Sequence, residues 1–118
     1  MKKYLIALFL LITLGNIGIA EAGKVCIWNL SDYVVKGCIN HNINNCTADM
    51  TFPTSETLKP TNGDTVTIYP YYAGPSKFVP LKTYTITKPY TTIYINGPWP
   101  WTPYINSSYK QSDYNVCN

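Results

Sequence analysis

Nine prolines are the feature that most restricts what this chain can fold into. All of them lie between residues 53 and 103 of a chain of 118 residues, at positions 53, 60, 70, 75, 80, 89, 98, 100 and 103. Proline lacks an amide hydrogen and clashes with the preceding helical turn, so the segments between these residues are too short for most helices. These segments are rich in tyrosine, threonine, isoleucine and valine, which favour strands. The pattern predicts an all-β fold: a small, single-domain antiparallel β-sandwich or open barrel of about seven strands.

The first 22 residues differ from the rest and predict a secretory signal peptide. Two lysines are followed by a largely apolar run, and Ala20-Glu21-Ala22 places small residues where a signal peptidase reads. A retained membrane anchor is the alternative, but the unbroken apolar stretch is short for a hydrocarbon core of about 30 Å. A lipoprotein is disfavoured because valine, rather than a small residue, precedes the first cysteine. We therefore predict cleavage after Ala22, a secreted or periplasmic location, and one domain over residues 23–118 without a transmembrane segment.

Four cysteines in an exported domain of this size predict two disulfide bonds. Residues 24–30 alternate, with Val25 and Ile27 on one face of a predicted strand and Cys26 and Trp28 on the other. If this strand forms an antiparallel hairpin with the strand after Ser31-Asp32, Cys26 lies opposite Cys38 and the aliphatic side chains gather on the other face. This register favours Cys26–Cys38 and leaves Cys46 to pair with Cys117, although spacing alone leaves the other two connectivities open. A zinc site is disfavoured because the chain has no Cys-x-x-Cys pair and one histidine, and we expect neither metal nor cofactor.

Turn residues further along predict two more hairpins. Asn62-Gly63 separates two strand-like runs, and Asn-Gly is a strong hairpin signal. Residues 88–90 (Lys-Pro-Tyr) separate the next two runs in the same way. We expect residues 71–81 to form a loop. We expect residues 99–103 to be extended but outside any regular central strand, because their prolines cannot donate to a ladder.

Charge and titratable residues argue against several functions. All nine basic residues are lysines, scattered singly beyond the N-terminus, so nucleic-acid binding is not expected. His41 lies in an asparagine-rich loop, and we expect a solvated residue rather than a catalytic base. The acidic residues form no local pair typical of a glycosidase. The chain is therefore expected not to be an enzyme, and a small hydrolase whose carboxylates meet only in the fold is an alternative.

Aromatic residues are the most unusual part of the composition, with 11 tyrosines and 3 tryptophans. Large rings dominate small β cores, and Trp28 and Tyr94 are candidates for this role. The remaining rings are more than such a domain easily hides, and exposed Tyr and Trp anchor interfaces. The alternative is that these rings pack against each other and close an edge of the sandwich. The predicted ligand-binding residues come from two clusters and are Tyr71, Tyr72, Trp99, Trp101 and Tyr104.

These features predict an exported, non-enzymatic binding or surface-interaction module. Its expected partner is a glycan or another extracytoplasmic protein, contacted through the exposed tyrosine and tryptophan rings. A second interpretation is an inhibitor of an extracytoplasmic hydrolase, which would present the loop between Cys38 and Cys46.

Overall fold

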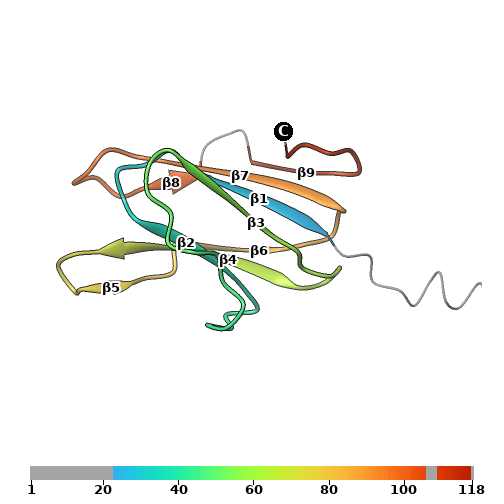
Figure 1. Cartoon of the computed structure of the whole chain (residues 1–118), viewed down its shortest axis with the longest axis horizontal. Coiled ribbons are helices and arrows are strands. Elements are labelled where there is room, and N and C mark those ends of the chain that lie inside the picture. The colour runs from blue at the N-terminus through green and yellow to red at the C-terminus, as the bar shows by residue number, and fades with distance from the viewer. Residues whose placement is uncertain (1–22, 106–108, 118) are drawn as a thin grey trace, which may run out of the picture.

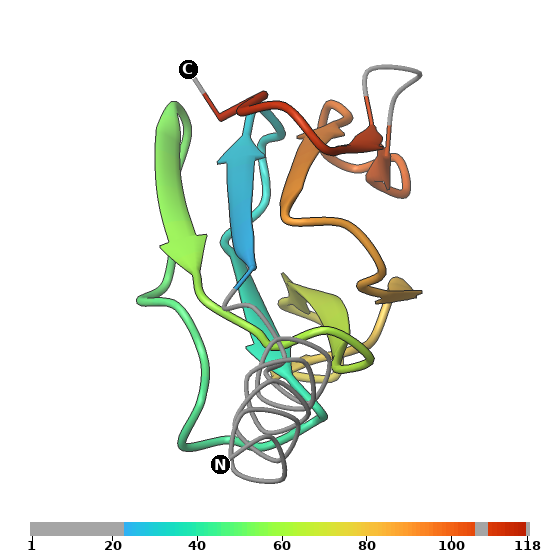
Figure 2. The same ribbon diagram turned by 90° about the vertical axis from the view of Figure 1, so that its right-hand side faces the viewer.

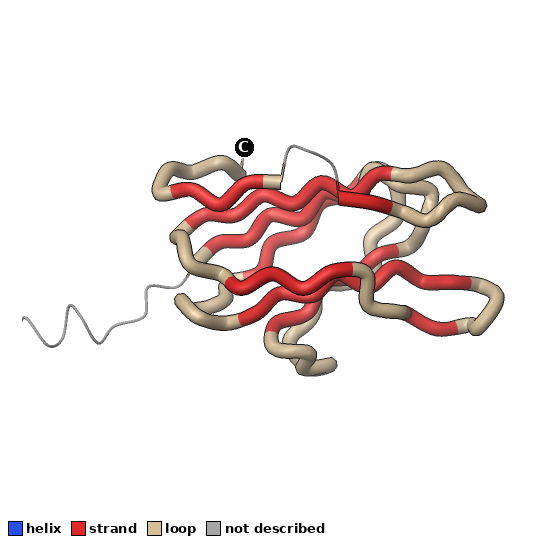
Figure 3. The backbone as a smooth tube through the Cα atoms, turned by 180° about the vertical axis from the view of Figure 1, so that it is seen from behind, coloured by secondary structure: helices blue, strands red, loops and turns tan. Residues whose placement is uncertain are grey.

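The computed structural model describes residues 23–105 and 109–117, which form an all-β sandwich without helices (Figures 1 and 3). The predicted signal peptide, residues 1–22, lies outside the described residues. Within the described ranges no helix is long and apolar enough to span a bilayer. The all-β prediction is confirmed, as a sandwich with more strands than expected. In chain order the strands are β1 (Lys24–Asn29), β2 (Val35–Ile39), β3 (Thr54–Leu58), β4 (Thr65–Tyr72), β5 (Lys77–Phe78), β6 (Lys82–Thr85), β7 (Tyr90–Asn96), β8 (Tyr104–Ile105) and β9 (Lys110–Ser112).

The first sheet is built around β1 and β7. Strand β1 pairs antiparallel with β3 and parallel with β7, while β8 and β9 both pair antiparallel with β7. The parallel register runs from Lys24 opposite Tyr90 to Asn29 opposite Ile95. In Figure 2, β3 (green), β1 (blue) and β7 (orange) lie side by side in this order.

The second sheet is built around β4. Strand β2 pairs with one edge of β4, and β5 and β6 pair with different stretches of its other edge, all antiparallel. Strands β4 and β5 form a hairpin in which Tyr71 lies opposite Phe78 and Tyr72 opposite Lys77. The expectation of a loop over residues 71–81 is therefore wrong at its start, because β4 continues through Pro70 to Tyr72.

The core lies between the sheets and is formed by alternate residues of facing strands. The chain alternates as expected in β1, where Val25 and Ile27 are fully buried and face inward. Burying such an aliphatic side chain contributes about 1.5–3 kcal/mol. Gly37 of β2 allows close packing here, since a Cβ at this position would clash with the Ile27 side chain. The other core side chains are those of Tyr33, Val35, Ile39, Met50, Leu58, Val66, Ile68, Ile86, Ile93 and Ile95.

The three predicted hairpins are wrong because each turn leads from one sheet to the other. Strands β1 and β2 lie in different sheets, as do β3 and β4, and β6 and β7. The Asn62-Gly63 turn itself is present: Gly63 has a φ of 95°, and the Asp64 amide donates to the Thr61 carbonyl. The turn residues thus determine where the chain reverses. Which sheet the next strand joins depends instead on which apolar faces can be buried together.

The two disulfides connect Cys26 with Cys117 and Cys38 with Cys46. The predicted pairing is therefore wrong, although the number of bonds is right. Its premise fails because Cys26 and Cys38 belong to strands of different sheets. Cys46 instead forms an isolated bridge opposite Cys38, with their Cα atoms 4.0 Å apart. Cys117 ties the C-terminal segment to the outer face of β1.

The expected core residues Trp28 and Tyr94 lie on the outer face of the first sheet. They occupy opposed positions on β1 and β7, on the face away from Ile27. Their rings are nearly parallel, with centroids 6.4 Å apart, and both are half-buried. The core itself is filled by aliphatic side chains and Tyr33.

Candidate functional site: an aromatic end of the sandwich

Two aromatic segments lie at one end of the sandwich, on the left in Figure 1. One is the tryptophan loop, residues 97–103, which joins β7 to β8. The other is the tyrosine hairpin, residues 71–78, which contains the β4–β5 turn. Both contact Tyr33, in the connection between β1 and β2. The Tyr33 hydroxyl donates to the Trp101 carbonyl over 2.7 Å, and the Tyr33 ring packs edge-on against the Tyr72 ring, with centroids 5.5 Å apart.

The tryptophan loop is held by its backbone. The Trp99 amide donates to the Asp32 carboxylate over 3.0 Å, and the Asp32 amide donates to the Gly97 carbonyl over 3.0 Å. Within the loop, the Trp101 amide donates to the Pro98 carbonyl. Gly97 has a φ of 132°, and a Cβ there would lie 2.8 Å from the Pro103 Cα, so the position requires glycine. The loop lies outside the strands, as its prolines predict, but it is not extended as expected, because Trp99 and Pro100 lie in a turn closed by the bond from Trp101 to Pro98.

The two tryptophan side chains of this loop remain in solvent. Trp99 is 67% exposed, Trp101 is 70% exposed, and the adjoining Tyr104 of β8 is 54% exposed. Such exposure is unusual for tryptophan, which is highly buried on average. The loop therefore presents two large rings on an anchored backbone.

The tyrosine hairpin places its rings against the protein. Tyr71 packs edge-on against Phe78, with centroids 5.2 Å apart, and Lys36 Nζ lies over the Phe78 ring, 4.4 Å from its centroid. Burial, and then the neighbouring Tyr33, raise the pKa of Tyr72 above its usual value. No ring pair among the described residues joins the hairpin directly to Trp99 or Trp101. The five predicted site residues thus share an end of the molecule without forming one continuous ring surface.

Asn29 organises the connection that supports both segments, and sequence reasoning missed it. Its side chain is fully buried and its Nδ2 donates to the carbonyls of Tyr33 and Met50, over 2.6 and 2.8 Å. Its Oδ1 accepts from the amide and the hydroxyl of Ser31. The sequence signal here was the polar break at Ser31-Asp32, which predicted a turn but gave no indication that Asp32 and Tyr33 hold a loop far along the chain.

Phe52 adds a fourth large exposed ring near this end of the sandwich, beside those of Trp99, Trp101 and Tyr104. It precedes β3, whose first residue, Thr54, lies opposite Asn29. Phe52 is 60% exposed. The exposed rings therefore come from separate segments of the chain. Phe52 was not among the residues predicted to bind a ligand.

The polar residues considered for catalysis have structural contacts. His41 is exposed, and its Nδ1 lies 2.7 Å from the Tyr69 hydroxyl on the outer face of the second sheet. Asp64 accepts from Asn40 and Thr61, and these hydrogen bonds lower the pKa of Asp64. Among the described residues, no group of three or more histidine, cysteine, aspartate or glutamate side chains could hold a metal ion.

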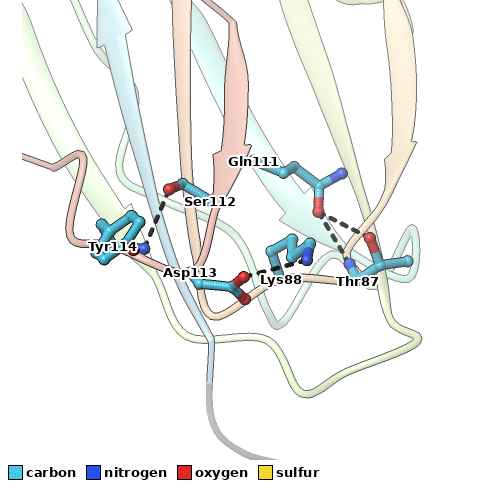
Figure 4. Close-up of polar contacts among 6 residues, drawn as sticks. All are labelled: Thr87, Lys88, Gln111, Ser112, Asp113 and Tyr114. Carbon is cyan, nitrogen blue, oxygen red and sulfur yellow. Dashed lines mark hydrogen bonds and ion pairs between the residues drawn. The ribbon is translucent and has the colours of Figure 1, made fainter.

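The last acidic residue, Asp113, belongs to a polar network at the other end of the sandwich (Figure 4). Its carboxylate lies 3.3 Å from Lys88 Nζ, and both side chains are largely exposed. The Gln111 Oε1 accepts from the Thr87 amide over 2.9 Å. These contacts join β9 to the connection between β6 and β7 and so fix the C-terminal segment.

Comparison with known proteins finds structures of similar fold but assigns the chain to no family. No family model matches the chain, and no curated protein matches its sequence. A solved structure described as the sugar binding protein pneumolysin aligns with a TM-score of 0.57 and 13% identity, over 79% of this chain and 24% of that one. The membrane-binding domain of pneumolysin aligns with a TM-score of 0.55 and 14% identity, over 79% and 99% of the two chains. A disulfide-locked mutant of intermedilysin with human CD59 aligns with a TM-score of 0.57 and 10% identity, over 79% and 24%.

At these identities the likeness shows a shared fold alone. This chain spans about a quarter of the longer proteins and nearly all of the separate domain that it matches.

Proposed function

We propose that this chain is an extracellular binding module that docks on lipid membrane surfaces through the tryptophan loop. The observation that carries the proposal is the exposure of Trp99 and Trp101 on a backbone held by Asp32 and Tyr33. Tryptophan is enriched at membrane–water interfaces because its ring is largely apolar and its N–H is polar. A loop that is already fixed loses little conformational entropy when it binds.

The surroundings of the loop support a membrane surface as the partner. Phe52 and Tyr104 add exposed rings, and Lys77 places an exposed cation on the tyrosine hairpin. A cation near the contact surface favours anionic lipid head groups. Small-ligand sites are generally concave, with a few converging polar groups, whereas Trp99 and Trp101 project from a loop. The likeness to a structure described as a membrane-binding domain agrees with this proposal.

Vesicle binding by the chain from residue 23 tests the proposal. Vesicles of phosphatidylcholine, with and without phosphatidylserine, should shift the tryptophan emission to the blue and carry the protein in flotation. Trp99→Ala and Trp101→Ala should each weaken binding, while their stability stays within about 0.5 kcal/mol of wild type. Trp28→Phe is the matched control, because Trp28 is half-buried on the outer sheet face. Binding that is unchanged in the Trp99/Trp101 double variant would contradict the proposal.

The loop between Cys38 and Cys46 supports a second candidate function, inhibition of an extracytoplasmic hydrolase. The disulfide closes this loop, which projects from the second sheet (Figure 1). The Ile39 amide donates to Asn45, and Ile43 is 82% exposed. A rigid loop with one exposed apolar side chain can fill a pocket of a partner protein. In assays of secreted hydrolases, Ile43→Ala should abolish inhibition and Trp101→Ala should not. Equal inhibition by wild type and Ile43→Ala would exclude this loop.

A further inference from the structure

A groove of about 410 Å³ lies along the side of the sandwich, between the edges of the two sheets. Strand β6 supplies one side, and the other comes from β8 and from Tyr109, just before β9. Leu81 and Ile105 contribute apolar surface. Tyr104, more than half exposed, also lines the groove. The groove adjoins the tryptophan loop and shares Tyr104 with the proposed membrane surface, but neither Trp99 nor Trp101 is among the described residues that line it.

Ring stacking and hydrogen bonds hold the Tyr84 and Tyr109 side chains that line the groove. The Tyr84 and Tyr109 rings stack with centroids 4.2 Å apart and an interplanar angle of 22°. Gln111 Nε2 donates to the Tyr109 hydroxyl and to the Thr85 carbonyl, each over 2.9 Å. Because the Tyr109 oxygen accepts this bond, its own proton is available to a ligand. Burial, and then Tyr109, raise the pKa of Tyr84 to about 12, so this hydroxyl remains neutral under physiological conditions.

Among the described residues that line the groove, the one charged side chain is that of Lys82. Lys82 Nζ lies 5.8 Å from the Tyr84 ring centroid. Over the described residues the single ion pair is Lys88–Asp113, which leaves the exposed Lys82 without a carboxylate partner. None of the described residues that line the groove is acidic. Its charge therefore favours an anionic ligand, and its aromatic walls favour a ligand with a flat apolar face.

We infer that this groove binds a sugar acid of the uronic type, with the sugar ring against Tyr104 and the carboxylate on Lys82. The C–H face of a sugar ring can pack on an aromatic ring, and its hydroxyl groups can bind those of Tyr104 and Tyr109. The volume is at the lower end of the range for small-ligand sites and suits about one or two sugar rings. A neutral sugar would make the ring contacts and lack the charged one.

A matched pair of sugars tests this inference. Methyl β-glucuronide and methyl β-glucoside share a ring and differ only in a carboxylate or a hydroxymethyl group. Titration of the isotope-labelled chain from residue 23, followed by NMR, should shift the amide signals of Lys82, Tyr84 and Tyr104. The glucuronide should bind about fivefold more tightly, the range of an exposed charge pair.

Variants then assign the contacts. Lys82→Gln should bring the two sugars to equal affinity, while Lys77→Gln, which removes an exposed cation outside the groove, should keep the preference. Tyr104→Ala should weaken both sugars. Thermal melts will show that the variants fold. Absence of saturable shifts, equal affinities in wild type, or a preference that survives Lys82→Gln would each overturn the inference. Loss of glucuronide binding in the Trp99/Trp101 double variant would also overturn it, because the binding would then belong to the tryptophan loop. Lys82→Gln should still bind vesicles through the tryptophan loop, so a failure of the groove inference can be distinguished from a failure of the membrane proposal.

Discussion

The tryptophan loop and the tyrosine hairpin both contact Tyr33, but through different groups. The hairpin contacts Tyr33 through the ring of Tyr72, whereas the loop contacts it through the backbone carbonyl of Trp101. In the hairpin, the aromatic ring of Tyr72 is therefore itself part of the packing at this end of the sandwich. The loop is held by hydrogen bonds to its main chain, and its rings stay in solvent. The exposure of an aromatic side chain thus depends on what already holds its backbone.

Proline accounts for part of this difference. The hairpin continues a strand ladder, in which Tyr71 and Tyr72 lie opposite Phe78 and Lys77. The tryptophan loop has prolines at 98, 100 and 103, which cannot donate to a ladder. Its amides and carbonyls are bonded instead by Asp32 and Tyr33.

Removal of Tyr33 should have the largest effect, because it removes the support of both segments. Tyr33 is buried, and large aromatic to alanine changes in a core cost about 3–5 kcal/mol. Chemical denaturation of Tyr33→Ala should show a loss of this size. Tyr33→Phe keeps the ring and loses the bond to Trp101, so it should cost about 1 kcal/mol. Equal losses in the two variants would mean that the ring contact with Tyr72 contributes nothing.

Direct truncation of each segment should separate packed rings from exposed ones. Tyr72→Ala should cost about 1–3 kcal/mol, since this ring is partly buried against Tyr33. Trp101→Ala should change the free energy of unfolding by about 0.5 kcal/mol or less. Iodide should quench the tryptophan emission of the wild type more than that of Trp101→Ala. The comparison of the two segments fails if Trp101→Ala proves the more destabilising change.

The sequence predicted those features that depend on local pattern. Alternation placed Val25 and Ile27 on one face and Cys26 and Trp28 on the other, as observed. The prolines correctly predicted an all-β chain and an irregular segment at 99–103. These are properties of the backbone and of strand geometry, which a short stretch of sequence determines.

Strand pairing and the disulfides could not be predicted in the same way. Strands that follow each other in the chain pair more often than not, and the predicted hairpins depended on this tendency. Here β1 lies parallel to β7, far along the chain, and this pairing has no local sequence signal. The error then passed to the disulfides, because Cys26–Cys38 was inferred from the β1–β2 register. The link from Asp32 and Tyr33 to residues 99 and 101 depends on the same long-range arrangement.

A smaller change should loosen the tryptophan loop while leaving its rings in place. Asp32→Ala removes the acceptor of the Trp99 amide and should cost about 1 kcal/mol. It should also weaken vesicle binding, because a loosened loop must be ordered again when it docks. Asp32→Asn keeps an oxygen acceptor and should bind vesicles more tightly than Asp32→Ala. If both variants bind as the wild type does, the fixed backbone is not what makes the loop a binding surface.

The smallest expected effect is on the alkaline stability of the tyrosine hairpin. Burial, and then Tyr33, raise the pKa of Tyr72, so the folded state favours its neutral form. The resulting stabilisation is fully present below the unfolded pKa of about 10 and is lost as the pH rises through the raised folded pKa. Phenylalanine does not ionise. Between about pH 9 and 11, roughly one pH unit either side of the unfolded tyrosine pKa, the Tm of Tyr72→Phe should therefore fall less than the wild-type Tm does. Tyr84→Phe is a matched comparison, because the pKa of Tyr84 is raised to about 12 by burial and Tyr109 and the difference should have the same sign. If the melting curves of Tyr72→Phe and wild type run parallel over this range, the Tyr72 hydroxyl is solvated, and the two segments differ less than their ring contacts indicate.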